Sequence, residues 1–410
     1  MQTPAWVRGA LAAAGLGGRP DGTGGPDGTG RPRKVKIALL ATVVVAVLVV
    51  GGVAAGTLGT ARAGQTAATG TGASQHAAAP AVPLRVLSVD QGGAVHGTDG
   101  AAPIRVTLSA PLAASSPRPV LHPAVPGSWH SAGTTLTFTP AAPFQPGTRI
   151  RVRFPAGPQS LRSAAGGTVG QAQTYRLRTR DWSTLRLKQV LAQLGYLPLK
   201  WRPQDATTPQ PDSMATELAA VYQPPAGHFR WRRGYPPILA TFWGGQSSLI
   251  MNGAIRAFQS NHGLLMTGVM TTALWHDVLR AAARDETNPS GYTYALASKA
   301  SPETLTVWHD GHVVMHTLAN TGIPAAPTAD GTSPVYLRYR NQIMRGTNPD
   351  GTKYADPVSW VAYFSAGEAV HYFPRGSYGF PQSLGCVELP YTQAEQVWPY
   401  LTYGTLVTVR

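Results

Sequence analysis

One segment, residues 37–58, constrains this chain more than any other, because it is apolar or small throughout and carries no charge. A helix rises about 1.5 Å per residue, so a segment of this length spans the roughly 30 Å hydrocarbon core of a bilayer. Basic residues that flank a span favour the cytoplasmic side, and four directly precede this one: Arg31, Arg33, Lys34 and Lys36. The sequence predicts a single-pass protein of the cell membrane with a cytoplasmic N-terminus.

Two other interpretations of residues 37–58 stay open. A cleaved signal peptide fits the small-x-small pattern Ala61-Arg62-Ala63, although its apolar region would be unusually long. A buried core helix fits the apolar composition, but the uninterrupted length and the Val/Ala/Gly content favour a membrane span. With an anchor or a signal peptide alike, residues 64–410 lie outside the membrane.

The net charge of +15 is unevenly distributed along the chain. Residues 1–36 hold six Lys/Arg and two Asp/Glu, residues 37–285 hold 21 and eight, and residues 286–410 hold seven and nine. A strongly basic middle outside the membrane suits an anionic polymer such as a cell wall. The topology and the lack of a recognisable nucleic-acid-binding sequence exclude nucleic acid as the expected partner.

The predicted organisation is multidomain and begins with Gly/Pro-rich and Ala/Gly/Thr-rich segments. Residues 1–36, in which Pro-Asp-Gly-Thr-Gly occurs twice, predict a disordered cytoplasmic tail, and residues 59–82 predict a flexible stalk. Residues 83–181 contain short alternating runs between Gly and Pro, which indicate an antiparallel β-sandwich acting as a spacer. The runs include Leu84–Val89, Ile104–Leu108, Thr135–Phe138 and Ile150–Phe154. The pattern resembles bacterial immunoglobulin-like spacer domains.

Residues 182–285 have apolar residues at helical spacing. One predicted helix runs from Leu185 to Leu194 and ends at Gly195, and another ends at Gly263-Leu264. The run Ala254-x-x-x-Phe-Gln-x-x-x-Gly-Leu, followed by Thr267-Gly-Val, resembles the small helical peptidoglycan-binding domain of wall enzymes. A Pro- and Trp-rich insertion, residues 200–249, interrupts the resemblance, and a plain helical bundle remains the alternative.

The pattern of residues 286–410 predicts a mainly-β region. Two apolar runs flank Asp310-Gly311, which predicts a two-residue hairpin. His309, His312 and His316 lie close in sequence, but no carboxylate or Cys spacing completes a zinc set, so we expect no metal site.

Cys386 is the only cysteine, so no internal disulfide is possible. It is a buried inert thiol, a partner in an intermolecular disulfide, or a nucleophile. His371 ends the apolar run Ala369-Val370, and Ser383-Leu384-Gly385 precede the cysteine. A histidine within hydrogen-bond reach activates a thiol and then protonates a leaving amine. Backbone N–H groups around Gly385 and Cys386 are candidates for an oxyanion site.

The pattern of a histidine after a strand and Ser-x-Gly-Cys-apolar resembles the L,D-transpeptidases of the YkuD family. Residues 321–332 resemble the Thr-Gly-x-x-x-x-x-Thr-Pro-x-Gly segment of that family, and residues 402–409 resemble its closing strand. This chain departs from the pattern at three positions. Leu384 replaces a usual second histidine, Glu388 a usual Asn or Arg, and Tyr372 a usual Gly or Ser.

The resemblance implies a C-terminal mainly-β L,D-transpeptidase domain that needs no cofactor and forms 3→3 cross-links between peptidoglycan stem peptides through a Cys386 thioester. His371 is implied as the base, with Ser383 and Gly385 beside it. Tyr354, Tyr372 and Leu384 are candidates for substrate contact, Arg375 and Lys353 for a substrate carboxylate, and carbapenem-type β-lactams are implied as inhibitors. An L,D-carboxypeptidase using water, and a non-catalytic wall-binding protein with a decayed catalytic domain, remain alternatives.

Overall fold

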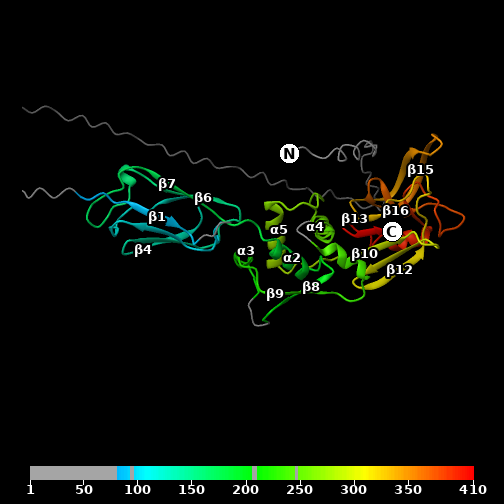
Figure 1. Ribbon diagram of the computed structural model, residues 1–410, viewed down its shortest axis with the longest axis horizontal. Helices are drawn as coiled ribbons and strands as arrows, with labels where there is room; N and C mark the ends of the chain where they lie inside the picture. Colours follow the sequence, from blue (N-terminus) through cyan, green and yellow to red (C-terminus); the bar gives the residue numbers. More distant parts are fainter. Residues whose placement is uncertain (1–80, 93–96, 206–209, 245–247) are drawn as a thin grey trace, which may run out of the picture. The chain divides into compact units, whose positions relative to one another are not determined.

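The computed structural model describes residues 81–410 apart from residues 93–96, 206–209 and 245–247 (Figure 1). The predicted tail, the predicted membrane span at 37–58 and all but the end of the predicted stalk lie outside the described residues. Within the described part, no helix is both long and apolar enough to cross a membrane.

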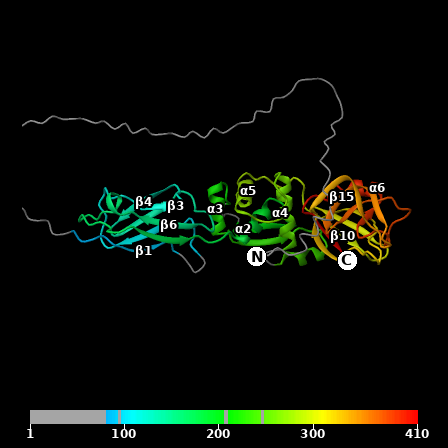
Figure 2. The same ribbon diagram turned by 90° about the horizontal axis from the view of Figure 1, so that it is seen from above.

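Residues 84–179 form two antiparallel sheets around one core (Figure 2). One sheet has the order β1-β2-β5-β4 and the other β3-β6-β7. In β6, Ile150, Val152 and Phe154 are fully buried while the arginines between them are exposed, because side chains alternate along a strand. The immunoglobulin-like assignment stays a prediction. The elements are β1 (Val86–Asp90), β2 (Ile104–Leu108), β3 (Val120–His122), β4 (Gly127–Ala132), β5 (Thr135–Pro140), β6 (Arg149–Phe154), the 3₁₀ turn η1 (Gly157–Gln159) and β7 (Gln173–Arg178).

The next region packs four helices and a two-stranded ribbon around a second core. Serine or threonine caps begin the helices, and the Ser183 side chain accepts from the Arg186 N–H, for example. A buried ion pair between Arg186 and Glu217, at 2.5 Å, ties α2 to α3. The predicted insertion supplies β8, α3, β9 and η2. The elements are α2 (Thr184–Gln193), β8 (Leu199–Pro203), α3 (Met214–Tyr222), β9 (Gly227–Trp231), η2 (Pro237–Trp243), α4 (Leu249–Asn261) and α5 (Thr272–Ala283).

The C-terminal region contains two sheets with the orders β12-β11-β10-β18-β13 and β14-β15-β16-β17. Small and branched side chains fill the core between the sheets, among them Ala295, Val307, Val370 and Val387. Asp310 and Gly311 both have positive φ in the β11–β12 hairpin, as expected of a two-residue turn. The elements are β10 (Thr293–Ser298), β11 (Thr304–His309), β12 (His312–Leu318), β13 (Gly331–Pro334), β14 (Leu337–Thr347), β15 (Lys353–Ser365), β16 (Glu368–Tyr372), β17 (Val387–Leu389), α6 (Tyr391–Val397) and β18 (Leu406–Val409).

A β-bulge in β15 lies opposite His371. Ser359 pairs with Tyr372 and Ala362 pairs with Val370, so Trp360 and Val361 together face the single residue His371. Trp360 has φ +58°, an unusual value for a bulky residue. The extra residue changes the alternation of β15, so that Trp360 packs in the core between the sheets and Val361 packs on the other face.

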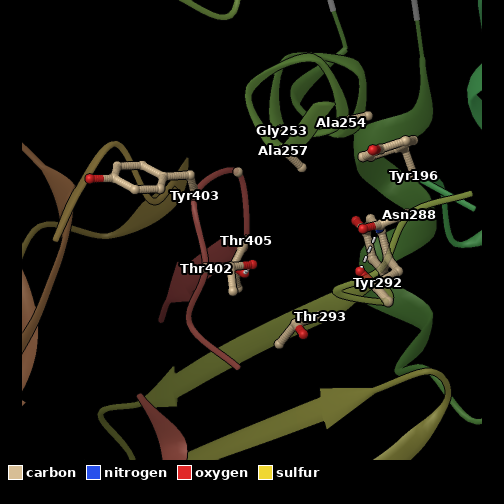
Figure 3. A pocket seen from close by; sticks show the side chains of 12 residues that line it. Tyr196, Gly253, Ala254, Ala257, Asn288, Tyr292, Thr293, Thr402, Tyr403 and Thr405 are labelled. Carbon is tan, nitrogen blue, oxygen red and sulfur yellow. Dashed lines mark hydrogen bonds between the residues drawn. The ribbon is translucent and has the colours of Figure 1, made fainter. Parts of the chain in front are cut away.

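The helical and C-terminal regions share apolar packing. Tyr292, Tyr294, Leu296 and Leu406 belong to the same buried cluster as the helices. Helix α4 and the turn at residues 402–405 line one shallow hollow (Figure 3). There a Cβ on Gly253 would collide with the Gly404 carbonyl, and a Cβ on Gly404 with the Gly253 carbonyl. Two glycines thus allow direct backbone contact.

Candidate active site

His371 and Cys386 lie on one face of the β14-β15-β16-β17 sheet. Strands β16 and β17 are parallel, with Val370 beside Val387 and His371 beside Glu388. Val370 and Val387 point into the core between the sheets. Because side chains alternate, Ala369 and His371 point away from it, and Cys386 packs in the same outer cluster as Ala369. The fold therefore brings the two predicted residues to neighbouring strands on a common face.

One hydrogen bond fixes the orientation of the His371 ring. Its Nδ1 lies 2.9 Å from the Tyr372 carbonyl oxygen, which can only accept, so Nδ1 carries the proton in the neutral ring. Nε2 is then the bare nitrogen that can accept a proton. His371 and Cys386 are sheet neighbours here without a hydrogen bond between them.

Ser383 organises the turn that carries the cysteine. Its buried hydroxyl accepts from the Gly385 N–H at 3.1 Å and donates to the Cys386 carbonyl at 2.6 Å. Gly385 has φ +114°, a conformation that favours glycine. The Gly385 N–H is thus already bonded, and the Cys386 N–H is the amide of this pair left for an oxyanion.

The Thr321 segment anchors the cysteine turn. Ser383 and Gln382 N–H groups both donate to the Thr321 carbonyl at 2.9 Å, and the Ile323 N–H donates to the Ser383 carbonyl. Glu303 is buried and accepts from both the backbone N–H and the hydroxyl of Thr321, at 2.6 and 2.7 Å. The resemblance at residues 321–332 therefore has a structural counterpart, since this segment holds the nucleophile's turn in place.

Glu388 and Arg375 form a two-bond ion pair beside the site. Arg375 Nε and Nη2 donate to the two carboxylate oxygens of Glu388, each at 2.8 Å, and Nη2 also donates to the Gln382 carbonyl at 3.0 Å. The Glu388 side chain is 5% exposed and that of Arg375 is 27% exposed. The pair joins the loop after His371 to the strand after Cys386. Arg375 is thereby occupied within the protein and is not presented to a substrate carboxylate.

Burial keeps the thiol protonated. It raises the pKa of Cys386 to about 12, and the carboxylates of Glu388 and Glu368 add to that rise, while a hydrogen bond from the Ala369 backbone opposes it. The residue as a whole is half-buried, and it packs against the outer cluster that includes Ala369. The resting nucleophile is a neutral thiol, so it needs a base during attack.

His371 is a neutral base at pH 7. Its burial lowers the pKa of the imidazole below the ordinary value of 6.5 and outweighs the opposing effects of the Tyr372 carbonyl and Glu388, while Arg375 lowers it further. A neutral imidazole with a bare Nε2 is the form that accepts a thiol proton.

Three phenols surround the thiol, and the sequence reasoning identified only Tyr354. Burial raises the pKa of Tyr336, Tyr354 and Tyr363, and the proximity of Cys386 contributes to each rise. Tyr336 and Tyr363 gave no local signal, because neither is near Cys386 in sequence. The ring of Tyr354 lies over Gly346 on the paired strand, where a Cβ would collide with it.

The other predicted substrate contacts are placed differently. The Tyr372 ring packs on the core side of the sheet against Tyr391, with centroids 5.1 Å apart. Tyr372 therefore contributes to the site through its carbonyl, which accepts from His371 Nδ1. Leu384 is 37% exposed at the tip of the cysteine turn, where it is accessible to a substrate. Lys353 is exposed and donates to Thr347.

Two further features lie away from this site. The hollow of Figure 3 is lined by neither Cys386 nor His371. His309 and His316 bond to the hydroxyls of Thr293 and Thr306 respectively, and the described residues hold no cluster of three potential metal ligands.

The family described as the L,D-transpeptidase catalytic domain (YkuD) matches residues 292–409. That part of the chain is therefore an L,D-transpeptidase catalytic domain, as the sequence resemblance predicted. The comparison does not extend to the regions predicted as spacer and peptidoglycan-binding domain, which stay predictions. No curated protein matches the chain.

Solved structures that are similar to this chain are also L,D-transpeptidases. The catalytic domain from E. faecium is 26% identical and covers 29% of this chain and 96% of its own, with a TM-score of 0.27. The same domain acylated by ertapenem is 26% identical and covers 29% of this chain and 97% of its own, also with a TM-score of 0.27. L,D-transpeptidase 3 from Mycobacterium tuberculosis is 14% identical over 79% of this chain and 98% of its own, at 0.27.

Proposed function

We propose that this protein is a peptidoglycan L,D-transpeptidase that forms 3→3 cross-links, with Cys386 as the nucleophile and His371 as the base. One observation carries the proposal. His371 and Cys386 share a sheet face, and the bond from His371 Nδ1 to the Tyr372 carbonyl leaves Nε2 as an acceptor on a ring with a lowered pKa. The family of residues 292–409 supplies the reaction class.

In the first half-reaction, Cys386 Sγ attacks the carbonyl carbon of the third, diamino-acid residue of a donor stem. His371 Nε2 takes the thiol proton and gives it to the amine of the departing D-Ala, which leaves a thioester. The high pKa of the thiol makes this coupled proton transfer necessary, because little free thiolate exists at neutral pH. The Cys386 N–H is the backbone donor nearest to the oxyanion.

In the second half-reaction, the side-chain amine of another stem attacks the thioester. His371 Nε2 accepts a proton from that amine as the new C–N bond forms. The thioester C–S bond then breaks, and His371 gives the proton to the departing Cys386 Sγ, which restores the thiol. Exposed Leu384 at the tip of the turn gives the acceptor an apolar contact in place of a polar one. Residues 37–58 would hold the domain at the membrane, facing the wall, as a single-pass anchor.

The test is covalent labelling by a carbapenem followed by intact-protein mass spectrometry. We expect one adduct on the wild-type chain and none on Cys386→Ala, and we expect His371→Ala to slow acylation about 10²- to 10⁴-fold. A disaccharide-tetrapeptide substrate should give cross-linked dimer. Tripeptide without dimer would instead indicate the carboxypeptidase, and an unchanged adduct on Cys386→Ala would refute the nucleophile. Matching melting curves serve as the folding control.

A second candidate, a wall-binding protein with a decayed catalytic domain, is favoured by the raised pKa of Cys386 and by Leu384 in place of a polar neighbour. The same labelling experiment separates the two. The absence of any adduct after hours at millimolar carbapenem would support decay, whereas stoichiometric acylation would support catalysis.

A further inference from the structure

The ribbon of strands β8 and β9 has two unlike faces. Leu199 pairs with Trp231 and Trp201 with Phe229, and these four side chains pack against the helical core. The alternate positions of the same strands carry cationic or titratable side chains, which point the other way: Lys200, Arg202, His228 and Arg230. Figure 1 shows the two strands side by side. The insertion therefore builds a ribbon with an apolar inner face and a basic outer face.

Register places like charges directly opposite one another. Lys200 pairs with Arg230, and both are exposed. Cations that face each other across a strand pair destabilise a sheet. The basic face thus works against the folding of its own ribbon, and an anionic ligand between the two cations would relieve that repulsion.

The basic face borders a groove of about 330 Å³. Five cationic side chains and one carboxylate line it with Trp231: Lys200, Arg202, Arg230, Arg232, Arg233 and Asp310. Asp310 belongs to the β11–β12 turn and is 3.1 Å from Arg232 Nη1, so its charge is already paired. The groove is strongly positive and lies against the C-terminal region, where the backbones of Gly234 and Gly311 touch.

We propose that this groove binds a linear wall polymer that carries regularly spaced oxyanions, either phosphates or carboxylates. Four of its five cations are arginines, whose planar forks match both groups. Lys200 and Arg202 are two residues apart on one strand, so they present charges about 7 Å apart to a repeating anion. The site is independent of the transpeptidation chemistry, since it uses none of the residues around Cys386.

The arrangement of the aromatic residues disfavours single-stranded nucleic acid. Proteins that bind it combine a basic groove with exposed aromatic rings on which bases stack. Here Trp201 and Phe229 point into the helical core, away from the basic face. Trp231 also lines the groove, but its ring packs against the helical core and lies edge-on to Trp243, with centroids 6.4 Å apart. A polymer without bases therefore fits the groove better.

The test measures binding of the full-length chain, in its Cys386→Ser form to remove catalysis, to three probes of matched charge. These are poly(glycerol phosphate), polygalacturonate and oligothymidylate. The binding variant carries Lys200→Gln, Arg202→Gln and Arg230→Gln. The matched control carries Arg149→Gln, Arg151→Gln and Arg176→Gln on the exposed face of β6 and β7, where Arg151 also faces Arg176. Both variants lose three charges from a paired basic sheet face.

We expect the groove variant to bind the preferred polymer at least about tenfold more weakly near 0.1 M salt and to reduce the salt slope by about 3. The control should change affinity less than about threefold. Neutralising the opposed cations should not lower the melting temperature, which separates lost binding from lost folding. The tighter of the two wall-type probes identifies phosphate or carboxylate as the ligand group. Equal weakening in both variants, no weakening in the groove variant, or equally tight oligothymidylate binding would each overturn the proposal.

Discussion

The Arg375–Glu388 pair should hold the cysteine turn in its reactive position. Glu388 is buried, and replacing it with glutamine leaves a guanidinium that is only 27% exposed without its counter-charge. Removing one partner of a buried pair costs about 3–5 kcal/mol, and the partial exposure of Arg375 reduces this to about 2–3 kcal/mol. If the whole of that cost falls on the cysteine turn, the rate of carbapenem acylation of Glu388→Gln falls by about 30- to 160-fold.

A double-mutant cycle measures the pair itself. Arg375→Gln, Glu388→Gln and the double variant would be compared by thermal unfolding and by the rate of carbapenem acylation from intact mass. We expect a coupling of about 1.5–3 kcal/mol, because the double variant leaves no unpaired charge. Loss of Glu388 also removes a negative charge that raises the thiol pKa, so the alkylation pKa should move down in Glu388→Gln. Additive single effects, or a Glu388→Gln enzyme with wild-type stability and acylation, would refute the clamp.

Three further outcomes are expected. Ser383→Ala should lower the free energy of unfolding by about 1–3 kcal/mol and slow acylation, because the Gly385 N–H and the Cys386 carbonyl lose their partner. Ser383→Thr keeps the hydroxyl and is the control. Equal acylation rates in the wild-type protein and both variants would contradict this prediction. Because the pKa of Cys386 is raised to about 12, its alkylation rate should rise about tenfold per pH unit to pH 10, and a plateau near pH 8.5 would argue against burial. Gly404→Ala should lower the melting temperature more than Gly351→Ala, because the two glycines have similar φ (+85° and +88°) but only Gly351 has open space around it. Equal losses of melting temperature would exclude the backbone clash at Gly404.

Local signals in the sequence predicted the elements that local chemistry decides. The Asp310-Gly311 hairpin and the helix end at Gly263 are observed because their residues tolerate positive φ. The His371 and Cys386 pair was also predictable, since each follows a recognisable strand or glycine turn. The reading of residues 200–249 as an interruption missed that they contribute a ribbon, a helix and part of the core.

Long-range packing decides the features that the sequence did not predict. Nothing local marks Trp360 for positive φ, because the bulge depends on how β15 pairs with β16. The pairing of Arg375 with Glu388 spans the loop between two strands, and it was not expected from either residue alone. The contact of Tyr372 with the core follows from strand alternation, which the sequence comparison did not take into account.

The packing that Tyr292, Tyr294, Leu296 and Leu406 share with the helices has a consequence for how such proteins are built and used. A catalytic fragment that begins at residue 292 would expose these side chains to water, and it would tend to aggregate during expression. Inhibitor screening therefore needs a chain that begins before α2. The same contact limits which gene fusions work, because a catalytic region fused to another protein stays soluble only when the helical region is included.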